Sequence, residues 1–128
     1  MDRLTLAEEI EATADSDPVE AVLIATTSFS PLADAADPRR IPSDRLGVVL
    51  QWDEARPLLD YRYDNDYGSE DCHAVYAHTA NWVVFIEVYD GATLVAKVPR
   101  HPQPGRPRMF GGTESRRFGR DGDTSQDS

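Results

Sequence analysis

The sequence predicts an α+β fold of two layers: a mostly antiparallel sheet of about five strands, an N-terminal helix and a second helix in the middle of the chain. Two pairs of β-rich runs, each pair joined by a short turn, predict two hairpins. A capping motif followed by apolar residues at helical spacing predicts the first helix. The chain has 128 residues, which is the length of one domain.

The first helix is expected directly after Thr5. Thr5 and Glu8 have the spacing of a capping box. The apolar residues that follow fall on one helical face: Leu6, Ala7, Ile10 and Ala14. This stripe is thin, so the helix must pack against another element to be stable.

The segment Val22 to Phe29 predicts a buried strand, because it is rich in β-branched residues. Asp17 followed by Pro18 is also a typical helix start, and a helix is the alternative here. The composition of the segment favours the strand.

Residues 30–44 predict a long surface loop, because they contain three prolines and show no apolar period. The loop holds Arg39 and Arg40, with Asp37 and Asp44 on either side. We expect these arginines to pair locally with the neighbouring acids.

The first hairpin is expected from Leu46 to Asp64. Its arms are LGVVLQW and LLDYRYD, and DEARP forms the turn between them. Leu59, Tyr61 and Tyr63 share one face of the second arm, which predicts that this face packs on the core.

The middle helix is expected at residues 69–79. Ser69 and two acidic residues provide a cap and an acidic first turn. Cys72, Val75, Tyr76 and Thr79 follow at helical spacing, although a strand is the competing interpretation for residues 72–79.

The second hairpin is expected at residues 82–98. WVVFIEVY and TLVAKV are β-rich, and Asp90-Gly91 between them is a strong turn signal. Pro99 closes the folded part. We therefore expect one compact acidic domain at residues 1–99 and a disordered tail at residues 100–128.

Charge separates the two parts. Residues 1–99 contain nineteen acidic residues against six arginines and one lysine, a net charge of −12, whereas residues 100–128 carry a net charge of +2. The tail is basic from 100 to 120 and acidic at its end. A domain with this much negative charge repels nucleic acids and anionic membranes.

The acidity has a particular form. Asp outnumbers Glu by fifteen to eight, and Arg outnumbers Lys by twelve to one. A surface of short carboxylates with almost no lysine suits concentrated salt, where self-repulsion is screened. A GC-rich genome would also favour arginine, so salt adaptation is a hypothesis.

The acidic N-terminus contains no apolar run, so no signal peptide is expected, and the location predicted is the cytoplasm. The single cysteine, Cys72, excludes an internal disulfide. No internal repeat or family motif is found.

The segment from Asp60 to His78 is the densest polar region and the candidate surface for a ligand or a partner. The site residues proposed from it are Asp60, Asp64, Asp66, Tyr67, His73 and His78. A calcium loop does not fit, because Gly68 falls one place early and Val75 occupies the twelfth position. A structural zinc site usually contains paired cysteines, and this chain has a single cysteine. No metal or cofactor is therefore expected.

The tail is the second candidate region. Its nucleic-acid contacts would come from Arg100, Arg106, Arg108, Arg116, Arg117 and Arg120. Met109, Phe110 and Phe118 lie among these arginines, and a segment of this kind can bind phosphates and stack on bases. It can equally fold back onto the acidic body, and its composition favours a solvated tail with no fixed partner.

Three function classes remain. The preferred one is a small, non-catalytic, cytoplasmic binding or accessory domain that acts through a protein partner or a small ligand. A weak nucleic-acid-associated protein that uses the arginine-rich tail is one alternative. A small metal-dependent or hydrolytic enzyme that uses the Asp60–His78 segment is the other, although no nucleophile or phosphate-loop motif is present.

Overall fold

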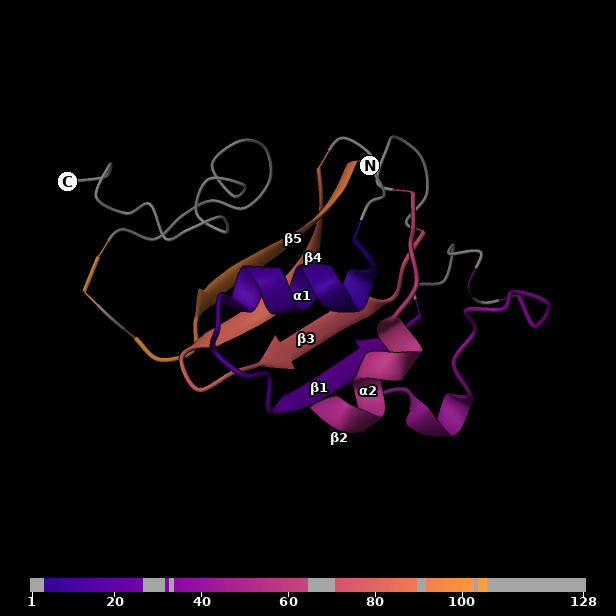
Figure 1. Cartoon of the computed structure of the whole chain (residues 1–128), viewed down its shortest axis with the longest axis horizontal. Helices are drawn as coiled ribbons and strands as arrows, with labels where there is room; N and C mark the ends of the chain where they lie inside the picture. Colours follow the sequence, from indigo (N-terminus) through magenta and orange to yellow (C-terminus); the bar gives the residue numbers. More distant parts are fainter. Residues whose placement is uncertain are drawn as a thin grey trace.

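The computed structural model describes residues 4–26, 32, 34–64, 71–89, 92–102 and 104–105. They form a five-stranded sheet of order β2-β1-β3-β4-β5, in which every neighbouring pair is antiparallel. Figure 1 shows helices α1 and α2 lying over this sheet. The predicted two-layer α+β class is confirmed. The elements are α1 (Leu6–Ala14), β1 (Ala21–Ala25), the 3-10 turn η2 (Ser43–Arg45), β2 (Leu50–Gln51), α2 (Trp52–Leu59), β3 (Ala74–His78), β4 (Trp82–Tyr89) and β5 (Ala92–Pro99).

Helix α1 is the element that the sequence predicts most completely. The Glu8 backbone N–H donates to Thr5 Oγ1 at 3.2 Å, and the Thr5 N–H donates to Glu8 Oε1 at 2.8 Å. The predicted capping box is therefore confirmed. The buried residues of the helix are the four that were expected: Leu6, Ala7, Ile10 and Ala14.

Strand β1 confirms the first half of the predicted strand, and residues 27–29 lie outside the described part of the chain. The segment from Asp17 to Glu20 is not helical, so the alternative helix start is excluded. The loop before η2 contains neither helix nor strand at residues 34–42, as expected.

The predicted hairpin at residues 46–64 is wrong. Only Leu50 and Gln51 pair with β1, and the chain then turns directly into α2. The expected turn DEARP is the body of this helix, because Gln51 and Glu54 form a second capping box and Ala55 and Arg56 favour helix. Residues 60–64 follow the helix without forming a strand.

The predicted helix at residues 69–79 is also wrong, and the competing strand interpretation is confirmed. Strand β3 pairs with β1 on one side and β4 on the other, with Leu23 and Phe85 both opposite Tyr76. The middle helix of the fold is α2 instead. Burial alternates along the segment, and the inward residues are His73, Val75, Ala77 and Thr79.

The predicted hairpin at residues 82–98 is confirmed. Strands β4 and β5 pair along their full lengths, from Trp82 opposite Pro99 to Tyr89 opposite Ala92. Beyond Pro99, the Arg100 N–H donates to the Asn81 carbonyl at 2.8 Å. Residues 106–128 lie outside the described residues, so the disordered tail stays a prediction.

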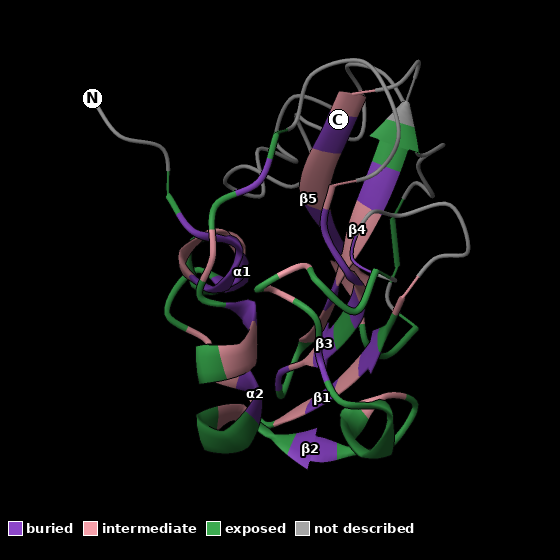
Figure 2. Cartoon of the chain, turned by 90° about the vertical axis from the view of Figure 1, so that its right-hand side faces the viewer, coloured by how far each residue is buried: buried purple, intermediate pink, exposed green. Residues whose placement is uncertain are grey.

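The core lies between the two helices and one face of the sheet, and Figure 2 shows both helices on that side. Leu6 and Ile10 of α1 and Leu59 of α2 are buried there against Val22 and Val84 of the sheet. Among the described residues, no helix is long and apolar enough to cross a bilayer.

Candidate functional site

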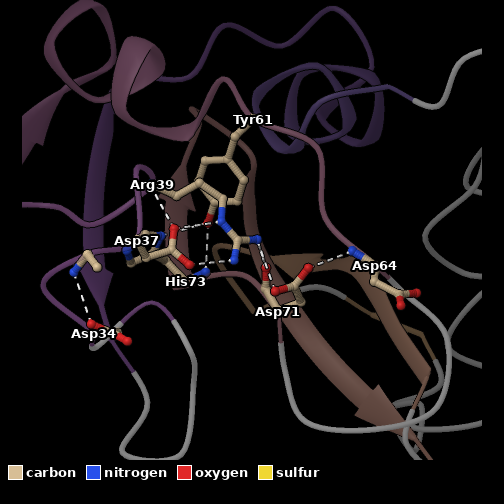
Figure 3. Close-up of polar contacts among 8 residues, drawn as sticks. Asp34, Asp37, Arg39, Tyr61, Asp64, Asp71 and His73 are labelled. Carbon is tan, nitrogen blue, oxygen red and sulfur yellow. Dashed lines mark hydrogen bonds and ion pairs between the residues drawn. The ribbon is translucent and has the colours of Figure 1, made fainter.

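A polar cluster joins the loop before η2 to the segment that precedes β3. The Arg39 side chain donates to the Asp37 carboxylate from Nε at 3.0 Å and from Nη2 at 2.8 Å. Its Nη1 donates to the Asp71 carbonyl at 2.9 Å and lies 3.0 Å from Asp71 Oδ1. Figure 3 shows the guanidinium between the two aspartates. The expected local pairing of Arg39 with Asp37 is confirmed, whereas the contact with Asp71 was not predicted.

Tyr61 and His73 complete this cluster. The Tyr61 ring lies against Arg39, with the guanidinium carbon 5.6 Å from the ring centroid. Its hydroxyl lies 2.6 Å from His73 Nδ1. The His73 side chain is fully buried, and its Nε2 has no hydrogen-bond partner among the described residues.

The pKa shifts fix the charges of the cluster. Hydrogen bonds from Arg39 lower the pKa of Asp37 to about 2. Burial alone would raise the pKa of Asp71, but hydrogen bonds from Arg39 and the Asp64 N–H outweigh it, and the net shift is downward. Burial, followed by the nearby Arg39 charge, lowers the pKa of His73 to about 4. At neutral pH the cluster therefore holds one cation, two carboxylates and an uncharged imidazole.

Most polar groups of this cluster are bound within the protein. Each of the three guanidinium nitrogens of Arg39 already donates within the protein, and burial raises the pKa of Tyr61, which keeps its hydroxyl protonated. Within the described ranges, no group of three His, Cys, Asp or Glu side chains is placed to hold a metal ion.

The described candidate residues of the Asp60–His78 segment, which are Asp60, Asp64, His73 and His78, do not all lie at one site. Asp60 lies on the helix side, where it accepts from Thr5 Oγ1 at 2.7 Å and lies 3.7 Å from Arg56. The Asp64 N–H donates to Asp71 Oδ2 at 2.9 Å, beside the polar cluster. Asp66 and Tyr67 lie outside the described residues.

Of the six tail arginines, Arg100 alone falls in the described part of the chain, and it is attached to the sheet. Its Nη1 donates to the Thr79 carbonyl at 2.7 Å and lies 3.5 Å from Glu20 Oε1. Arg106, Arg108, Arg116, Arg117 and Arg120 lie outside the described residues.

His78 lies on the second face of the sheet, opposite the helices. Because Val75 and Ala77 of β3 face the core, the alternating residues Tyr76 and His78 point to the other side. The register then places a cross-strand row on this side, from Leu23 through Tyr76 and Phe85 to Ala96. We call this side the open sheet face; its described residues are Ala21, Leu23, Ala25, Gln51, Ala74, Tyr76, His78, Val83, Phe85, Glu87, Ala92, Leu94, Ala96 and Val98.

The open sheet face is mostly apolar. Its polar members among the described residues are Gln51, Tyr76, His78 and Glu87, and Tyr76 in the central strand is 58% exposed. The sequence held a signal for this face that the hairpin prediction did not use. WVVFIEVY is apolar at both odd and even positions, which is typical of a strand covered on both sides.

Comparison of the chain with protein-family models, with curated proteins and with solved structures gives no match. The geometry alone therefore supports the functional proposal.

Proposed function

We propose that the chain is a non-catalytic, cytoplasmic binding domain that docks a partner protein through the open sheet face. The observation that carries this proposal is Tyr76, which is 58% exposed in β3 between the partly exposed Leu23 and Phe85, on the side away from both helices. Exposed aromatic side chains are enriched at interaction sites on proteins.

The charge of the domain defines the chemistry of the partner. Residues 1–99 carry a net charge of −12, so a partner segment with basic residues around an apolar centre is attracted and oriented by the field. An aromatic side chain such as Tyr76 supplies a large contact area at a low entropy cost.

The polar cluster supports the non-catalytic part of the proposal. Its guanidinium donors are bound to Asp37 and Asp71, and the Tyr61 hydroxyl is bound to His73. These groups fix the loop at residues 34–42 to the start of β3, which is a structural task.

A peptide-display selection on the full chain tests the proposal. We expect enriched peptides to carry Arg or Lys around an apolar centre. Tyr76→Glu, which places a charge in the row, should weaken their binding by about tenfold or more. Val49→Glu is the matched control, because Val49 is 69% exposed and lies outside the open sheet face.

The two variants make the result decisive. If no peptide is enriched, or if both variants bind the enriched peptides as the unmodified chain does, the open sheet face is not the binding surface. Thermal unfolding of each variant shows that a loss of binding is not a loss of the fold.

A further inference from the structure

Three segments that belong to no strand meet in the polar cluster. Arg39 comes from the loop at residues 34–42, Tyr61 follows α2, and His73 directly precedes β3. The Tyr61 hydroxyl lies 2.6 Å from His73 Nδ1 and accepts from the His73 backbone N–H at 2.9 Å. Arg39 lies against the Tyr61 ring and donates to the Asp71 carbonyl (Figure 3). The three segments are therefore held together by polar contacts around one histidine.

The position of His73 fits a neutral imidazole and not a charged one. The residue is 0% exposed, and its Nε2 has no hydrogen-bond partner among the described residues. In an imidazolium both ring nitrogens carry a proton, and each proton needs an acceptor. The Nε2 proton of a charged His73 would be buried without an acceptor in the described part of the chain, which costs free energy. This argument holds whichever nitrogen carries the proton of the neutral ring.

The charges around His73 do not remove this cost. The Arg39 guanidinium repels a second cation, and it already pairs with Asp37 and Asp71. The Asp37 charge favours an imidazolium, but burial and Arg39 have the larger effects, so the pKa of His73 is lowered to about 4. An imidazolium is thus less stable in the closed cluster than in water.

The cluster also fixes the chain on both sides of Cys72. Arg39 binds the carbonyl of the residue before it, and Tyr61 binds the backbone N–H of the residue after it. Cys72 itself is 1% exposed and packs in the core. The Cys72 thiol and the Tyr61 hydroxyl, whose pKa is raised by burial, are the remaining titratable groups beside His73. If the two flanking bonds open, the thiol is no longer held away from water.

We propose that protonation of His73 opens the polar cluster, so that residues 34–42 and 60–64 separate from residues 71–73 while the sheet stays paired. The closed form holds a neutral imidazole, and the opened form exposes an imidazolium to water. Acid therefore shifts the population toward the opened form. The sheet is spared because the cluster lies outside all five strands. This inference does not rest on the proposed function, because no residue of the cluster belongs to the open sheet face.

Cys72 is the single cysteine of the chain, so its reactivity measures the opening directly. A dipyridyl disulfide, which reacts with thiols in acid, modifies the full chain at a series of pH values between 7.5 and 5. Each rate is divided by the rate of a model thiol at the same pH. For one proton and a ring pKa that changes from about 4 to 6.5 on opening, the corrected rate should rise about thirtyfold over this range.

Two variants serve as controls. His73→Asn removes the titrating group, and its corrected rate at Cys72 should change by less than about threefold over the same range. Cys72→Ser with Ala77→Cys moves the thiol into β3, where Ala77 is 0% exposed. This thiol reports opening of the sheet and should show no comparable acceleration. Thermal unfolding verifies that both variants are folded at each pH.

Low concentrations of urea separate local opening from unfolding of the whole domain. Local opening exposes little surface, so the rate at Cys72 should hardly depend on urea well below the unfolding transition. A rate that falls as steeply with stability as global unfolding does would overturn the proposal.

Three further results would also overturn it. A corrected rate at Cys72 that is constant between pH 7.5 and 5 excludes an acid-driven opening. Equal acceleration of the thiols at positions 72 and 77 means that acid loosens the whole sheet. An acceleration that persists in His73→Asn assigns the acid response to another group.

Discussion

The Tyr61 hydroxyl contacts His73 twice: its oxygen lies 2.6 Å from the ring Nδ1 and 2.9 Å from the backbone nitrogen. Because a backbone N–H only donates, the Tyr61 oxygen accepts that bond. The direction of the hydrogen bond between the Tyr61 hydroxyl and Nδ1 depends on the tautomer of His73. Tyr61 thus fixes the position of the chain before β3.

The buried imidazole predicts a loss of stability in weak acid. The pKa of His73 is lowered to about 4 in the folded state, mainly by burial, against 6.5 in the unfolded chain. Between these values the unfolded state binds more protons, so the free energy of unfolding falls as the pH falls from 6.5 to 4. The loss from this group is up to about 3 kcal/mol, measured by urea unfolding at a series of pH values.

The control for this prediction is His73→Asn, in which the side-chain amide still hydrogen-bonds to Tyr61 but does not titrate. Its unfolding free energy should vary less with pH between 6.5 and 4. An NMR titration of the unmodified chain gives a second measurement, and a His73 ring that becomes protonated near pH 6.5 would refute the assignment.

Arg39 should contribute more to stability than the arginine beside it. Replacing it with alanine removes three hydrogen bonds and the ion pair with Asp71, and leaves Asp37 and Asp71 without their shared cation. We expect Arg39→Ala to lower the free energy of unfolding by about 2 kcal/mol. Arg39→Lys should recover less than half of this, because an ammonium does not match both aspartates.

Arg40→Ala is the matched control, because Arg40 is exposed and adjacent; it should change stability by less than about 0.5 kcal/mol. Hydrogen exchange at residues 34–42 locates the effect. Equal losses in the Arg39 and Arg40 variants would contradict a specific anchoring role for Arg39.

The sequence predicted the elements whose signals are local. The capping box at Thr5 and Glu8 and the β-rich runs at 82–98 each lie within one element, and both are confirmed. Strand β3 was only the second interpretation of its segment, because the inward positions on either side of it, His73 and Thr79, are polar. This hides the apolar alternation, while Cys72, Val75, Tyr76 and Thr79 match a helical spacing by coincidence.

The sites depended on contacts that no local pattern contains. Arg39 meets Asp71 across 32 residues, and the row on the open sheet face exists only once the register of four strands is set. Asp60 and His78 seemed to form one polar segment, but they lie on the helix side and on the open face respectively. Proximity in sequence was therefore a poor guide to a shared site.

Two adjacent residues of β3 test which side of the sheet is the core. Val75 is 3% exposed, so Val75→Ala should lower the free energy of unfolding by about 2 kcal/mol through lost apolar contact and a cavity. Tyr76 is 58% exposed, and Tyr76→Thr, which introduces a β-branched side chain that suits a strand, should change it by less than about 1 kcal/mol. Chemical unfolding measures both, and a larger loss for Tyr76→Thr would reverse the assignment of the faces.

Salt should stabilise the domain if its acidic surface is adapted to concentrated salt. Residues 1–99 carry a net charge of −12, and this self-repulsion is screened at high ionic strength. We expect the melting temperature to rise steadily from low to molar sodium chloride. Asp15→Asn with Asp44→Asn, at two exposed positions, should give a smaller rise because part of the repulsion is already removed. A melting temperature that is constant across this range would refute salt adaptation. The composition of the genome would then explain the excess of arginine over lysine.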